Sequence, residues 1–99
     1  MPIVNVLSGN KESITHVTNL TTSGWSGSAA PFTQTLTING VLPTSNGIIG
    51  LPTTATEAQW AAAEEASLRI TTVGTNSITI TARKKKPTIA IPVELIIIP

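Results

Sequence analysis

Hydrophobic and polar residues alternate along several segments of this chain, with the period of two that is typical of half-buried β-strands. In residues 32–39, threonines occupy one parity and the other carries Phe32, Gln34, Leu36 and Ile38. Residues 77–82 alternate isoleucine with threonine, and residues 88–98 place an aliphatic residue at every second position. We therefore expect each of these segments to be a strand with one face in a core.

Weaker patterns predict further strands at residues 3–7, 13–20 and 68–73. Turn-forming residues separate the strands, at residues 8–11, Asn46-Gly47, residues 74–76 and residues 83–87. Because the strands from residue 68 onward follow one another closely, we expect them to form a β-meander. Residues 21–30 are rich in Thr, Ser, Gly and Ala, which predicts a loop anchored by Trp25.

One helix is expected, over residues 55–67. Two capping boxes are compatible with its start, because Thr54 with Glu57 and Thr56 with Gln59 both have the required spacing. At helical spacing, one side carries an alanine stripe and the opposite side carries glutamates, with Trp60 at the border. The stripe consists of Ala55, Ala58, Ala62 and Ala66, and would let the helix lie close to a sheet or to another subunit.

The length of 99 residues allows a single domain, residues 1–99, with a modest core. Aromatic residues make up only 3% of the chain and cysteine is absent, so neither large rings nor disulfides reinforce that core. We therefore expect a mainly β fold, a small antiparallel β-sandwich or β-meander with one short α-helix, intertwined in an oligomer.

The predicted last strand is apolar on both faces at its end, and another subunit would cover the face that the core does not. The interface candidates are Trp60, Ala58, Ala62, Ile96, Ile97 and Ile98. Pro92 lacks an N–H for a strand ladder, which predicts an edge position or a bulge.

Charged residues account for 11% of the chain and the formal net charge is +1. This balance gives no electrostatic reason to expect nucleic acid or an anionic membrane as a partner. The sequence shows no basic, apolar leader of the kind that directs export, and its apolar runs are too short to span a membrane. We expect synthesis in a cytoplasm and release by lysis or as part of a particle.

Catalytic chemistry has little support in this sequence. His16 is the one histidine, there is no aspartate or cysteine, and no second titratable residue forms a motif with it. Glu64 and Glu65 are adjacent in the predicted helix and point in different directions, so they do not suggest a paired site. We expect no enzyme activity, no cofactor and no metal.

Two features could contact a ligand. Trp25 could stack on a sugar, although it is also suited to fill one end of an aromatic-poor core. Arg83, Lys84, Lys85 and Lys86, called here the basic turn, could bind an anionic glycan or surface, although a solvated hairpin tip would have the same composition.

Several short motifs, taken in order, resemble a module of phage and prophage structural proteins from Gram-positive hosts. They are the segments Gly24–Gly27, Pro31–Thr35 and Asn39–Val41, the helix, the strand at residues 77–82, and Lys86-Pro87-Thr88 through Ile91-Pro92-Val93. The resemblance implies a capsid- or tail-associated fibre or decoration module of the virion, made in the host bacterial cytoplasm. It further implies a homotrimer that contacts other virion proteins, and it implies no catalytic residues.

The chain begins with only a short lead before these motifs, so a long shaft or attachment domain is not expected, and the chain could be a stand-alone accessory protein or a fragment. The alternative function is a carbohydrate- or receptor-binding tip of a phage adhesin, for which a host-surface glycan is the expected partner.

Overall fold

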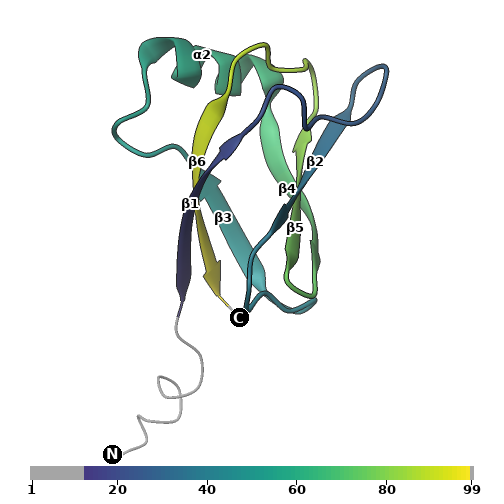
Figure 1. Ribbon diagram of the computed structural model, residues 1–99, viewed down its shortest axis with the longest axis vertical. Helices are drawn as coiled ribbons and strands as arrows, with labels where there is room; N and C mark the ends of the chain where they lie inside the picture. Colours follow the sequence, from purple (N-terminus) through teal and green to yellow (C-terminus); the bar gives the residue numbers. More distant parts are fainter. Residues whose placement is uncertain (1–12, 99) are drawn as a thin grey trace, which may run out of the picture.

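The computed structural model describes residues 13–98, which form six strands and one helix (Figure 1). In chain order these are β1 (Ile14–Leu20), β2 (Phe32–Thr37), β3 (Asn46–Gly50), α2 (Glu57–Ala66), β4 (Leu68–Gly74), β5 (Ser77–Ala82) and β6 (Ile91–Ile98). The strand expected at residues 3–7 and the turn at residues 8–11 lie outside the described residues.

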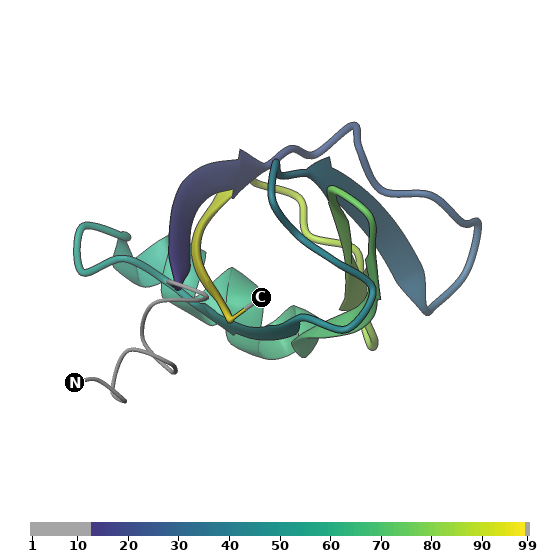
Figure 2. The same ribbon diagram turned by 90° about the horizontal axis from the view of Figure 1, so that it is seen from below.

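The strands form two antiparallel three-stranded sheets that pack face to face as a sandwich. Sheet A has the order β1-β6-β3, and sheet B has the order β2-β5-β4. Seen along the sandwich, β3 of sheet A lies beside β4 of sheet B, while β1 and β2 are the edges on the other side (Figure 2). The mainly β fold with one helix that the sequence predicts is confirmed, in its sandwich form.

The core lies between the sheets and is almost entirely aliphatic. β5 and β6, the central strands, contribute every second side chain to it, in keeping with the alternation of their sequences. Its largest fully buried side chains are Leu20, Val41, Ile78, Ile80, Ile91, Val93, Leu95 and Ile97. Each such side chain stabilises the fold by about 1.5–3 kcal/mol relative to an exposed one, which makes this cluster the main source of stability.

The helix α2 begins with the second of the two capping boxes. Thr56 Oγ1 accepts a hydrogen bond from the Gln59 N–H at 3.1 Å, and the Thr56 N–H donates to Gln59 Oε1 at 2.8 Å. Ser67 caps the C-terminus of the helix, since its φ of 58° is left-handed and its N–H donates to the Ala63 and Glu64 carbonyls.

The side of the helix that packs on the sandwich differs slightly from the predicted alanine stripe. Ala63 and Ala66 are buried and Ala62 is half-buried, whereas Ala58 is exposed. The physical reason is that alanines occupy several sides of this helix, so their spacing alone does not select one. The predicted stripe, which includes Ala58, is therefore rotated about the helix axis away from the side that packs on the sandwich.

The last strand also departs from expectation. β6 does not extend a meander beside β5, because it crosses to the other sheet and lies between β1 and β3. Pro92 is nevertheless tolerated in this central strand. The pairing with β3 stops at Gly50 and Glu94, so at Pro92 only β1 is a neighbour.

The Asn46-Gly47 pair does not form a turn and instead begins β3. A Cβ at Gly47 would lie 3.0 Å from Ile70 Cδ1 of β4, so glycine allows the two sheets to approach closely here. The left-handed turn glycine of this region is Gly40, with φ +95°, whose N–H donates to Asn76 Oδ1.

Candidate functional site

The outward face of sheet A carries four exposed aliphatic side chains, called here the aliphatic face. They are Val17 of β1, Ile48 of β3 and Ile96 and Ile98 of β6, with exposed fractions of 58%, 60%, 38% and 49%. They stand on the opposite parity from the core residues of the same strands, so the sandwich itself cannot cover them. A clustered apolar surface of this kind is typical of an interaction site.

The strand register brings these side chains together. Ile96 lies between Thr15 of β1 and Ile48 of β3, in one row across the sheet. In the next row Glu94 lies between Val17 and Gly50. The face is therefore a set of branched aliphatic side chains with one carboxylate among them.

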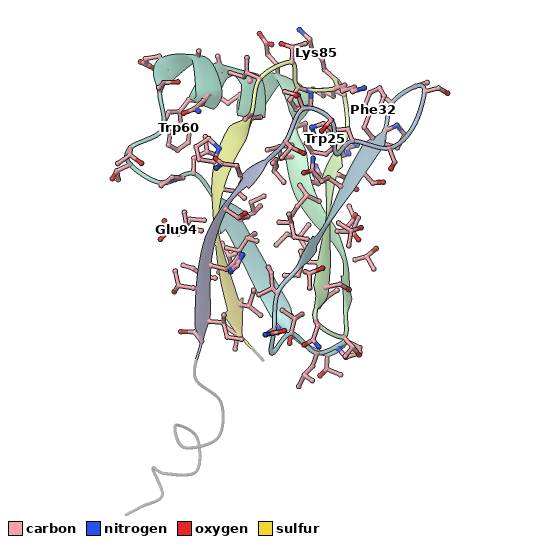
Figure 3. The ribbon with its side chains drawn as sticks, in the orientation of Figure 1. Trp25, Phe32, Trp60, Lys85 and Glu94 are labelled. Atoms are coloured by element: carbon pink, nitrogen blue, oxygen red, sulfur yellow. The ribbon has the colours of Figure 1, made fainter. Side chains whose placement is uncertain are left out.

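Trp60 of α2 adds an aromatic ring near the upper end of this face. Its side chain is 40% exposed. In Figure 3 Trp60 and Glu94 both project on the side of sheet A that faces away from sheet B. The exposed ring of Trp60 and the aliphatic face therefore lie on the same side of the sandwich.

Among the interface candidates from the sequence, Ile96, Ile98 and Trp60 lie in or near the aliphatic face. Ile97 does not, because it is completely buried between the sheets. Ala62 packs against the core from the helix, whereas Ala58, one helical turn earlier, is exposed. The prediction that Ile97 lies in the interface is therefore wrong, because adjacent residues of a strand point to opposite faces.

The outward face of sheet B is chemically different. It is lined by threonines, and two pairs of hydroxyls are hydrogen-bonded across strands: Thr35 with Thr79 at 3.0 Å, and Thr71 with Thr81 at 2.6 Å. A hydroxyl can hydrogen-bond with water or with a neighbouring hydroxyl, so this face is more polar than the aliphatic face. The two sides of the sandwich thus differ sharply in their affinity for water.

Trp25 is a core residue, with 6% of its side chain exposed. A sugar cannot stack on a covered ring, so of the two roles that the sequence suggests for Trp25 the structure supports the one that fills one end of the core. The loop around it is held by Gln34, which accepts from the Thr21 N–H at 3.0 Å and donates to the Thr21 carbonyl at 3.1 Å. A Cβ at Gly24 would lie 2.7 Å from Gln34 Cδ, so a larger residue there would displace the Gln34 side chain from its bonds to Thr21.

The basic turn is exposed at the end of the sandwich where α2 terminates. The Arg83 and Lys84 N–H groups donate to the carbonyls of Ser67 and Ala66, which gives this loop a structural role at the helix C-terminus. Lys85 Nζ lies 3.4 Å from Glu65 Oε1, with both side chains 61% exposed. A receptor-binding function would now depend on this turn without Trp25.

Catalytic and metal-binding geometry is not evident in the part of the chain that the structure describes. His16 is half-buried on the inward side of β1, opposite Leu95 of β6. Residues 13–98 contain no pocket and no group of three potential metal ligands. None of the helices described here has the length and apolar character needed to cross a membrane.

Three residues of the site, Val17, Ile48 and Glu94, are not among the candidates that the sequence predicts. Val17 could have been found from its parity, which is opposite to that of Ile14 in β1. Ile48 directly follows Asn46-Gly47, for which the sequence predicts a turn. The strand that contains Ile48 is therefore not predicted.

No family model matches the chain, and neither the curated proteins nor the solved structures contain a match to it. Function is therefore inferred from the chain itself.

Proposed function

We propose that this protein is a structural building block of a phage virion, made in the bacterial host cytoplasm and active through self-assembly. In this proposal three copies associate, and the aliphatic face of each is covered by a neighbouring copy or by another virion protein. The observation that carries it is the contrast between the aliphatic face of sheet A and the hydroxyl-lined face of sheet B. That contrast supports association of the chain, while the phage virion and the number of three copies are taken from the sequence resemblance to phage structural modules.

The free energy gained by burying the aliphatic face determines how much other contacts of the interface must contribute. Burying a valine or isoleucine completely is worth about 1.5–3 kcal/mol, so covering what remains exposed of each contributes about 1 kcal/mol. Association costs about 4–15 kcal/mol in lost freedom of motion. The four side chains of the aliphatic face are therefore not sufficient by themselves, and further contacts must contribute to a stable trimer.

Light scattering coupled to size-exclusion chromatography, together with native mass spectrometry, tests this proposal. We expect the wild-type protein to be trimeric at micromolar concentration. The double variant Ile48→Lys/Ile96→Lys places two charges on the aliphatic face, and we expect it to be a folded monomer.

The matched control is Thr37→Lys/Thr72→Lys, which adds the same charge to exposed positions of sheet B. We expect this control to remain trimeric. A wild-type protein that stays monomeric at micromolar concentration would remove the basis of the proposal.

A further inference from the structure

Glu94 is a carboxylate placed within an apolar surface, and it has no cationic partner among residues 13–98. The single ion pair of this part of the chain joins Lys85 to Glu65. Figure 3 shows the Glu94 side chain projecting from the outward face of sheet A. A charge in this position can bind a cation from another molecule or prevent unwanted contacts of the surface.

The surroundings of Glu94 leave room for an incoming side chain. Its neighbour on β3 is Gly50, and a Cβ built at Gly50 would meet no atom within 4 Å. Its neighbour on β1 is Val17, which is 58% exposed. A lysine or arginine fits such a place, because its aliphatic stem can lie along apolar side chains while its charged head pairs with the carboxylate.

The chain carries suitable cations on a different part of its surface. Within residues 13–98, all lysines and arginines are Arg69 and the basic turn, and Arg83, Lys84 and Lys86 have no ion-pair partner there. The backbone of Arg83 and Lys84 is held against the end of α2, so these side chains extend from a positioned loop. In Figure 3 Lys85 lies at the end of the sandwich, whereas Glu94 lies on its flank.

The geometry points to a head-to-tail contact between copies, in which a side chain of the basic turn of one copy crosses the aliphatic face of the next and pairs with Glu94. This inference rests on the proposed self-assembly and names the two surfaces that meet. Two different surfaces in contact form a heterologous interface, and repetition of such an interface closes a ring such as a trimer when the rotation between copies adds up to a full turn. The ion pair also supplies part of the interaction that the aliphatic side chains alone do not provide.

A charge-swap experiment tests this contact by measuring the dissociation constant of the oligomer in sedimentation equilibrium. We expect Glu94→Lys to weaken association about tenfold or more, since like charges then face each other. Arg83→Glu, Lys84→Glu and Lys86→Glu are then each combined with Glu94→Lys, and we expect one of the combinations to restore association. Glu64→Lys, on the exposed side of α2, is the control with the same change in charge and should leave association unchanged.

Glu94→Gln provides a second and conservative test, because it removes the charge and keeps the shape. Weaker association of this variant supports the contact. Tighter association would show that Glu94 keeps the face from binding and would overturn the contact, as would an oligomeric wild type that no combination of swaps affects. A monomeric wild type would overturn the proposed function at the first step, before any variant is compared.

Discussion

Trp25 and Trp60 are the two largest side chains of the molecule, and their positions give them different roles. Trp25 is 6% exposed and fills the core where the loop of residues 21–31 closes one end of the sandwich. Trp60 is 40% exposed on α2, near the aliphatic face. The first ring therefore contributes to folding, and the second is available for contact with a partner.

We predict that Trp25→Ala lowers the free energy of unfolding by about 3–5 kcal/mol, the cost of removing a buried aromatic ring and leaving a cavity. Trp60→Ala should cost about 1 kcal/mol, because much of its ring is already in water. Urea unfolding followed by circular dichroism measures both values. The Ile48→Lys/Ile96→Lys background, which we expect to be monomeric, excludes effects of association, and similar losses for the two variants would contradict this assignment.

At the scale of the elements, the start of α2 distinguishes between two threonines that the sequence makes equivalent. Thr56 forms the reciprocal bonds with Gln59, while Thr54 lies outside the helix in the preceding turn. We predict that Thr56→Ala destabilises the protein by about 1 kcal/mol through loss of the cap, and that Thr54→Ala has almost no effect. Thermal unfolding of the two variants checks this, and the reverse order of effects would contradict the observed cap.

Alternation along the chain was sufficient to locate β2, β5 and β6, because a strand with one buried face imposes a period of two on its sequence. It could not identify the partner of β6. A side chain's parity shows that it is buried but not which strand lies beside it. The hairpin between β4 and β5 was predictable because the turn residues 75–76 join them directly, whereas β6 pairs with β1 across most of the chain.

The candidate site was predictable only in part for a related reason. Ile96 and Ile98 were found because three adjacent isoleucines must expose at least one side chain. Val17 and Ile48 join them through the register of sheet A, which is a property of the fold and is not visible in any one strand. The position of Glu94 among exposed aliphatic side chains can be recognised only when its two neighbours across the sheet are known.

At the scale of the whole molecule, the difference between the two sheet faces predicts that stability depends on protein concentration. If copies cover one another's aliphatic faces, association stabilises the folded state by mass action. We predict that the Tm of the wild type rises as its concentration increases from low to high micromolar. The Tm of Ile48→Lys/Ile96→Lys should stay constant over the same range, and equal behaviour of the two proteins in calorimetry would contradict the prediction.

The central place of β6 has a consequence for how the molecule comes to be folded. Of the described strands β6 is synthesised last, yet both β1 and β3 depend on it for their hydrogen bonds. While the ribosome is still making residues 91–98, these two segments have no ladder to join. Sheet A can therefore assemble only after translation of β6, and its long sequence separations favour slow formation compared with a helical protein of this size.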